Sequence, residues 1–159
     1  MKNARSIKDK ASAPGTGAAI VSSGHFPMRY ATVCAEVLAR ALRGEVLTGM
    51  DAVFAASTTR LAAHIGYLEK DYGWSFERGN KAVGCKDGRV QTITTYWLAQ
   101  SVIAHAMQRD GSVWCDSVRA ARAEKRARAP QAQELAHRCN RAAQARNQAA
   151  QAGLFDALP

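Results

Sequence analysis

The stretch Leu47–Leu98, LTGMDAVFAASTTRLAAHIGYLEKDYGWSFERGNKAVGCKDGRVQTITTYWL, decides the fold. It predicts a short helix, a tight turn, a longer helix and then a β-hairpin. The short helix is expected over Gly49–Ala55, capped by Thr48, with Asp51 placed to return a hydrogen bond to the cap. We expect this helix to bury Val53, with Ala52 and Phe54 as further candidates.

The longer helix is expected over Thr58–Tyr72, and Ser57 or Thr58 can cap it. Leu61, Ile65 and Leu68 recur at helical spacing and form the stripe that this helix buries. The residues between the members of this stripe point in other directions, so they stay available for contacts.

The hairpin is predicted from a turn signal and an alternating strand. Asp87-Gly88 suits a tight hairpin turn, and Val90–Leu98 alternates as a return strand does. Trp74–Glu77 is expected to form the first strand. Aromatic residues are expected to pack the hairpin onto the longer helix: Trp74, Tyr96 and Trp97.

Helices are expected on both sides of this stretch. Upstream, Tyr30–Arg43 places Val33, Val37 and Ala41 on one face. Downstream, two helical segments end near Gly111 and at Pro130, and an Ala-, Gln- and Arg-rich helical segment comes after them. The predicted organisation is a flexible basic tail (1–29), a helix and hairpin module (30–98), a basic helical extension (99–152) and an apolar C-terminal tail (153–159).

The charge of the chain points to a polyanionic partner. The 159 residues carry a net charge of +9, with a pI of about 9.8. Residues 47–98 hold six Lys/Arg and five Asp/Glu, for a net charge of +1, whereas the segments on either side each carry +4. The flanking segments therefore hold most of the excess positive charge.

Several classes of function are not supported by the sequence. The four cysteines, Cys34, Cys85, Cys115 and Cys139, are far apart and have no histidine at ligand spacing, which predicts reduced thiols and no metal site. We find no glycine-rich phosphate loop, nucleophile elbow or metal-binding His/Glu motif, so neither an enzyme nor a cofactor is expected. No apolar run approaches the length of a membrane span, and the protein is expected to be cytoplasmic.

Three short segments carry a family resemblance: Leu47–Ala52, Ser57–Ile65 and Tyr67–Trp74, completed by the strand Ile93–Leu98. Together they resemble the winged helix-turn-helix superfamily, and more narrowly small helix-turn-helix proteins of phage and prophage origin. The match covers about a third of the chain. The implied fold is mainly α with a small β-hairpin wing, that is, a winged helix-turn-helix followed by C-terminal helices.

The resemblance implies DNA binding through the start of the longer helix, because the major groove admits one α-helix and its leading side chains reach base edges. Arg60 is the best candidate to read a base, since its guanidinium can bond two acceptors of guanine. The implied DNA-binding residues on the helix and in the turn before it are Ser57, Thr58, Thr59, Arg60, Ala63, His64, Tyr67 and Lys70. Those on the wing, which suit backbone phosphates, are Lys81, Lys86 and Arg89.

Other interpretations of the same residues remain open. Acidic Glu69, Asp71 and Glu77 lie near the proposed interface and repel DNA unless they point away. Arg60 could instead pair with Asp51 or Glu69 on a solvated face. A nearly neutral module also suits docking on a host protein, such as an inhibitor of transcription, replication or defence machinery.

The C-terminal part of the chain suggests two accessory roles. Its arginines could contact DNA phosphates independently of base sequence, or could form a solvated helix face. The accessory phosphate contacts expected there are Arg119, Arg122, Lys125, Arg126 and Arg128. The end of the chain, with Gln151, Leu154 and Phe155, resembles peptides that bind the bacterial sliding clamp, unless its apolar residues fold back onto the core.

The sequence thus predicts a DNA-binding protein, a transcriptional regulator of phage or prophage type, with double-stranded DNA as its partner. Homodimerisation is plausible, because paired half-sites require it. The alternatives are an interaction protein that docks on a host protein, or a sequence-blind basic protein that binds nucleic acid.

Overall fold

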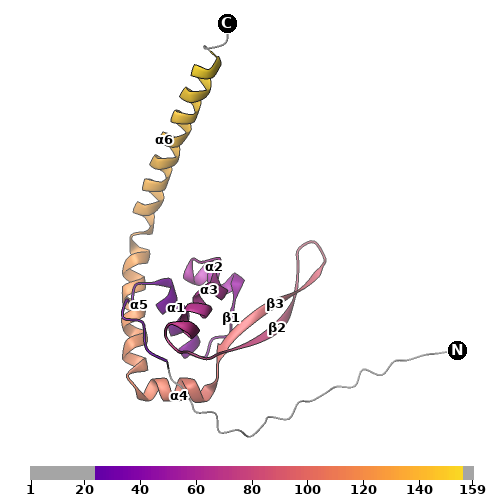
Figure 1. Ribbon diagram of the computed structural model, residues 1–159, viewed down its shortest axis with the longest axis vertical. Coiled ribbons are helices and arrows are strands. Elements are labelled where there is room, and N and C mark those ends of the chain that lie inside the picture. Colours follow the sequence, from indigo (N-terminus) through magenta and orange to yellow (C-terminus); the bar gives the residue numbers. More distant parts are fainter. Residues whose placement is uncertain (1–23, 156–159) are drawn as a thin grey trace, which may run out of the picture.

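The computed structural model describes residues 24–155 and is mainly α-helical, with a small antiparallel sheet (Figure 1). This agrees with the predicted fold class at that coarse level. The elements in chain order are α1 (Val33–Leu42), β1 (Leu47–Thr48), α2 (Gly49–Ala56), α3 (Leu61–Lys70), β2 (Phe76–Gly84), β3 (Val90–Leu98), α4 (Gln100–Gln108), α5 (Gly111–Ala127) and α6 (Ala129–Phe155).

The sheet has the strand order β1-β3-β2, with every pair antiparallel. β3 pairs with β2 from Phe76↔Leu98 to Gly84↔Val90, and its other edge pairs with the two residues of β1. The hairpin turn is closed by a 3.0 Å bond from the Gly88 N–H to the Cys85 carbonyl, and Gly88 adopts a φ of +82°. β2 continues well past the predicted end at residue 77, because backbone pairing with β3 holds its polar second half in the sheet.

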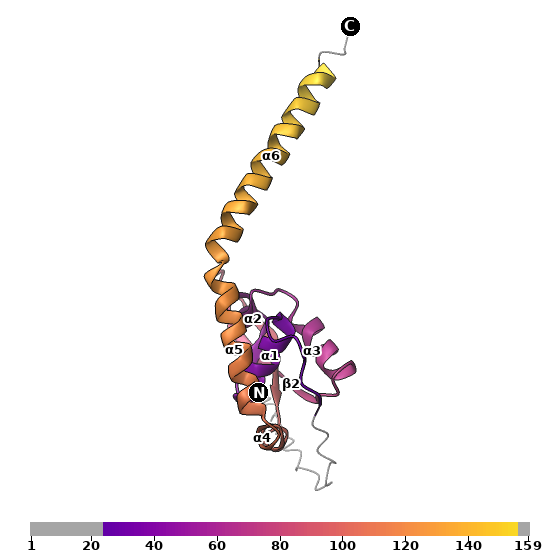
Figure 2. The same ribbon diagram turned by 90° about the vertical axis from the view of Figure 1, so that its left-hand side faces the viewer.

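The core forms around α1, which is buried on nearly every side. Ala35, Val37, Leu38, Ala41 and Leu42 are each at most 1% exposed. They meet the predicted stripe of α3, which is likewise buried, and side chains from the sheet, α4 and α5. Both ribbon views accordingly show α1 in the middle of the body, with α5 along one side (Figures 1 and 2).

The turn between α2 and α3 differs from the prediction. Thr48 caps α2 as expected, accepting a bond from the Asp51 N–H at 3.2 Å and donating to the Asp51 carboxylate at 2.6 Å. Ser57, however, ends α2 in the left-handed region (φ 57°), so it does not cap the next helix. The Thr58 hydroxyl accepts a bond from the Arg60 N–H within the turn, and α3 begins at Leu61 instead of residue 58.

The segment 24–29, expected within a flexible tail, belongs to the folded body. The His25 N–H donates to the Tyr72 carbonyl at 2.7 Å, and the Trp74 indole donates to the His25 carbonyl at 2.8 Å. Phe26 lies between Trp74 and Trp114, with ring centroids 5.5 Å and 5.0 Å away. The segment was unpredicted because its bonds are made to residues far along the chain. Residues 1–23 of the expected tail lie outside the described residues.

The boundary predicted at residue 98 does not separate the module from the next two helices. Val102, Ile103 and Ala106 of α4 and Trp114 and Val118 of α5 are buried in the same core as α1 and α3. α4 and the first part of α5 are therefore components of the body. Of the predicted extension 99–152, it is α6 that extends from the body.

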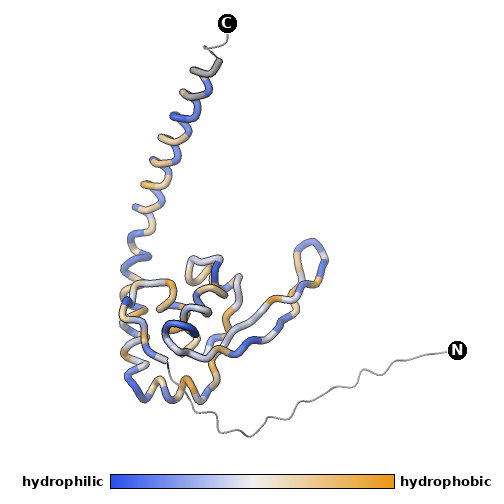
Figure 3. Tube along the Cα trace, in the orientation of Figure 1, coloured by the Kyte–Doolittle hydropathy of each residue, from blue (hydrophilic) through white to orange (hydrophobic). Residues whose placement is uncertain are grey.

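α6 extends away from the body as a single helix of 27 residues, about 40 Å long at ~1.5 Å per residue (Figures 1 and 2). Arg128 separates it from α5, and Pro130 sits in its first turn, where a missing N–H costs little. Hydrophilic and hydrophobic residues alternate along it (Figure 3), and most of its described side chains are exposed. The apolar tail was predicted over 153–159, but residues 153–155 belong to α6. The remaining four residues of the predicted tail lie outside the described part.

Candidate nucleic-acid interface

The leading turn of α3, defined as Thr59–Ala63, reaches the surface, and its first two residues precede the helix, which begins at Leu61. Thr59, Arg60 and Ala63 are exposed, whereas Leu61 and Ile65 on the other side are at most 3% exposed. Ser57 is exposed and Thr58 is half-buried in the turn that precedes the helix. Thr59, Arg60 and Ala63 are therefore free of cover from the body, and the helix is fixed to the core by its opposite face.

The second half of α3 offers a mixed surface. Tyr67 is 56% exposed and Lys70 is also exposed. His64 is half-buried, and its Nδ1 is buried without a hydrogen-bond partner among the described residues. Burial lowers the pKa of His64 below the usual 6.5, so its imidazole is neutral at pH 7. This side chain offers no positive charge to a phosphate at that pH.

The hairpin carries the predicted basic residues on exposed positions. Lys81, Lys86 and Arg89 are all exposed. The Arg89 guanidinium lies 2.6 Å from the Asp87 carboxylate, and its hydrogen bonds lower the pKa of that carboxyl. Asp87 is thus ionised at neutral pH and offsets part of the charge of Arg89. The two lysines carry the remaining positive charge of this part of the hairpin.

One of the three acidic residues close to α3 is paired with an arginine, and the other two are exposed. Glu69 pairs with Arg78 of β2 at 2.6 Å, and that arginine also lies 5.8 Å from the centre of the Tyr96 ring. Asp71 and Glu77 are exposed. Arg60 forms no ion pair with the residues that the structure describes, so its predicted alternative pairing with Asp51 or Glu69 is not observed.

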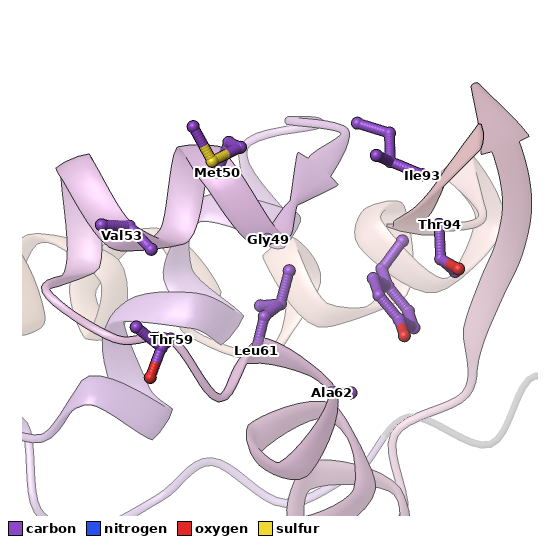
Figure 4. A pocket seen from close by; sticks show the side chains of 9 residues that line it. Gly49, Met50, Val53, Thr59, Leu61, Ala62, Ile93 and Thr94 are labelled. Carbon is purple, nitrogen blue, oxygen red and sulfur yellow. The ribbon is translucent and has the colours of Figure 1, made fainter. Parts of the chain in front are cut away.

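A groove of about 440 Å³ lies beside the start of α3, between α2 and β3 (Figure 4). Its lining is mostly apolar, and Met50 on its rim is 61% exposed. The prediction that α2 buries Val53 and Phe54 is wrong: Val53 is 37% exposed and lines the groove, and Phe54 is 80% exposed. The expected burial of Ala52 is confirmed, and Ala56 faces the core beside it. The small residues of α2 pack inward because α1 lies close behind them.

The arginines of α5 are not all free to contact phosphate. Arg122, a predicted phosphate contact, is 8% exposed; it lies 2.5 Å from Glu36 of α1 and donates to the Ala56 carbonyl at 3.3 Å. That prediction is therefore corrected. Arg126 also pairs with Glu36 and donates to the Ala55 carbonyl at 2.7 Å, although half of its side chain is exposed.

The remaining C-terminal candidates lie on the surface. Arg119 pairs with Asp116 at 3.1 Å, and Arg128 pairs with Glu124, each on its own helix or at its end. Lys125 is exposed. Such exposed pairs are weak and can exchange a carboxylate for a phosphate.

The predicted partner motif lies at the far end of α6. Gln151 is exposed, and the helix carries Leu154 and Phe155 away from the body (Figure 1). Folding back of these two residues onto the core is therefore not observed.

Other features of the described residues bear on function. No three His, Cys, Asp or Glu side chains gather there as a metal site requires. Within the same residues, no helix combines the length and the apolar character needed to cross a bilayer. Comparison with models of protein families, with curated proteins and with solved structures finds no match to this chain.

Proposed function

We propose that the protein binds double-stranded DNA as a winged helix-turn-helix, with α3 in the major groove and the β2–β3 hairpin beside it on the backbone. The observation that carries this proposal is the exposure of Thr59 and Arg60 directly before α3 and of Ala63 in its first turn, while the opposite stripe of the helix is buried. The order helix, turn, helix, hairpin supports it.

The residues of this surface fall into two groups, those suited to contact base edges and those suited to contact phosphates. Arg60 can donate to both acceptors of a guanine, which is worth about 1–3 kcal/mol of discrimination. Thr58 and Thr59 suit phosphate oxygens or a thymine methyl group. Lys81 and Lys86 on the hairpin suit phosphates, which position the protein without reading sequence.

The positive charge outside the module supplies affinity. Lys125 lies at the end of α5, Arg128 lies at the junction with α6, and further arginines follow along α6 as it extends from the body. Phosphate contacts made there make binding fall steeply with salt, because each contact releases counterions. Deleting residues 129–159 removes α6 and leaves the buried core of α5 intact, so it tests the contribution of the α6 arginines without removing the fold.

The biological role that fits these features is transcriptional regulation of phage or prophage type. Two copies bound to paired half-sites would extend the surface that reads DNA. α6 provides a long, exposed helix through which two copies can associate. The C-terminal residues Gln151, Leu154 and Phe155 remain a candidate motif for a clamp-like partner.

A second function is favoured by the apolar groove. Met50 and Val53 are exposed on its α2 side, next to the leading turn of α3. Apolar side chains gain little from a phosphate backbone, whereas a partner protein can bury them. The second candidate is therefore docking of this face on a host protein.

Selection from a pool of duplexes with 20 random base pairs separates these functions. The DNA-reading proposal predicts enrichment of a short motif, and the Arg60→Ala variant should lose preference at one position of it. Binding with no enriched motif would indicate a sequence-blind protein. If the full chain binds no nucleic acid at 50 mM salt, DNA binding is refuted and docking becomes the better function.

A further inference from the structure

A second cleft lies between α1, the C-terminal end of α2 and α5, apart from the groove beside α3. Its volume is about 520 Å³, within the range of small-molecule sites. Five arginines line it together with two glutamates and Phe54. The arginines are Arg40, Arg43, Arg119, Arg122 and Arg126.

The cleft holds more positive charge than its carboxylates can neutralise. Glu36 serves both Arg122 and Arg126. Glu45 serves both Arg40, at 2.6 Å, and Arg43, at 3.7 Å. Five arginines against two glutamates leave a net charge of +3. Asp116, which pairs with Arg119 from outside the cleft, reduces this to +2.

The arginines differ in how firmly they are held. Arg122 forms a fixed floor, since it is 8% exposed and bonded to a carboxylate and a backbone carbonyl. The side chains of Arg43 and Arg126 are 41% and 50% exposed, so they can turn toward a ligand. Phe54 is 80% exposed, and its ring is open to stacking.

We propose that this cleft binds a small phosphate-bearing ligand with an aromatic ring, of the nucleotide class. Guanidinium groups donate paired hydrogen bonds to phosphoryl oxygens, and a phosphate group removes the excess charge that the glutamates leave. Phe54 offers a face on which a base can stack. A concave site with a buried arginine at its floor fits a small ligand better than it fits a duplex backbone.

The position of the cleft connects it with the turn that leads into α3. Arg126 and Arg122 donate to the carbonyls of Ala55 and Ala56, the last two residues of α2. A phosphate that draws Arg126 away would release one of these bonds next to Ser57. The site itself does not depend on the proposed function, because binding can be measured without DNA.

Calorimetric titration of the full chain with ADP, inorganic pyrophosphate, adenosine and a 20-base-pair duplex tests the proposal. The variants are Arg43→Gln, at the rim, and Phe54→Ala; Arg141→Gln on α6 is the matched charge control. Circular dichroism melting checks that each variant is folded. ADP should bind more tightly than pyrophosphate, and adenosine should not bind.

Arg43→Gln should weaken ADP binding about tenfold, as expected for one lost charged hydrogen bond. Phe54→Ala should weaken ADP and leave pyrophosphate unchanged, and Arg141→Gln should change neither. The proposal is overturned if neither phosphate compound binds at 1 mM, if only the duplex binds, or if Arg43→Gln has no effect. Pyrophosphate binding as tight as ADP binding, with Phe54→Ala neutral, would overturn the nucleotide class.

Discussion

The ion pair between Arg122 and Glu36 should be a main determinant of stability. It joins α5 to α1 across 86 positions of sequence, and Arg122 also holds the last carbonyl of α2. Arg122→Ala removes both links, together with a 3.5 Å bond to the Ala31 carbonyl. It leaves the Glu36 carboxylate, whose side chain is 9% exposed, with Arg126 as its remaining ion-pair partner among the described residues.

The expected decrease in the free energy of unfolding follows from these contacts. Breaking a buried ion pair by removing one partner costs about 3–5 kcal/mol, because the other charge stays buried. Arg126 still pairs with Glu36, which places the ion-pair loss at the lower end of that range. The hydrogen bond to Ala56 adds about 1 kcal/mol, so we expect a total of about 4 kcal/mol.

Urea unfolding followed by circular dichroism measures this loss directly. Arg119→Ala is the matched control, because it removes the same residue type from the same helix. Its pair with Asp116 is exposed, with side chains 69% and 63% exposed, and exposed pairs are worth about 0–1 kcal/mol. The two variants should therefore differ by at least about 2 kcal/mol in the free energy of unfolding.

Equal destabilisation by Arg122→Ala and Arg119→Ala would refute the reasoning. A double variant gives a second check. Glu36→Leu combined with Arg122→Met leaves no charge of this pair buried, and replacing both partners with apolar residues is often nearly neutral. The double variant should recover most of the stability that Arg122→Ala loses.

Three further changes test local features of the fold. Thr48→Ala should cost about 1 kcal/mol in urea unfolding, because it removes the cap of α2 and both bonds to Asp51; an unchanged midpoint would contradict the capping geometry. Gly24→Ala should destabilise by about 1–3 kcal/mol, since its Cβ would meet the Tyr72 carbonyl and lie 2.7 Å from Trp74 Cδ1. Gly49→Ala, which has open space, should show no such loss in the same assay. Because burial lowers the pKa of His64 in the folded protein, the imidazole of the unfolded chain is protonated first as the pH falls. The free energy of unfolding should therefore be highest above about pH 6.5 and decrease below it. His64→Gln should flatten that decline between pH 7.5 and 5, and an identical slope in both proteins would exclude His64 as its source.

Much of the body could be predicted because its signals are local. The strand Val90–Leu98 agrees residue for residue with the prediction, since alternation and the Asp-Gly turn fix its position. The buried stripe of α3 follows from helical spacing. The cap at Thr48 follows from the choice of residue and the position of Asp51.

The features that were missed depend on contacts between distant residues. Segment 24–29 has no periodicity of its own and is ordered by bonds to Tyr72, Trp74 and Trp114. Arg122 looked like one member of a basic run, and only its distance from Glu36 gives it a different role. A single glutamate within the apolar α1 was the one sequence signal for that pair.

The candidate site was predicted in part. The hairpin candidates and Ala63, Tyr67 and Lys70 of α3 are exposed, as the sequence analysis expected. Thr58, Thr59 and Arg60 precede α3 instead of lying on it, because the helix begins three residues later. Ser57 caused that difference, because its left-handed conformation ends α2 instead of starting α3. The apolar groove was unforeseen, since α2 is short enough that either of its faces could have been buried.

Fluorescence anisotropy with a labelled duplex, selected from random sequences by the intact chain, tests the central claim most directly. Arg60→Ala is compared with Arg29→Ala, which removes the same charge from an exposed position near Tyr72, beyond the C-terminal end of α3. The account predicts that Arg60→Ala weakens binding about 5- to 150-fold, equivalent to about 1–3 kcal/mol, and that Arg29→Ala changes it by less than about twofold. Equal affinities for the two variants would contradict the assignment of the α3 leading turn as the surface that reads DNA.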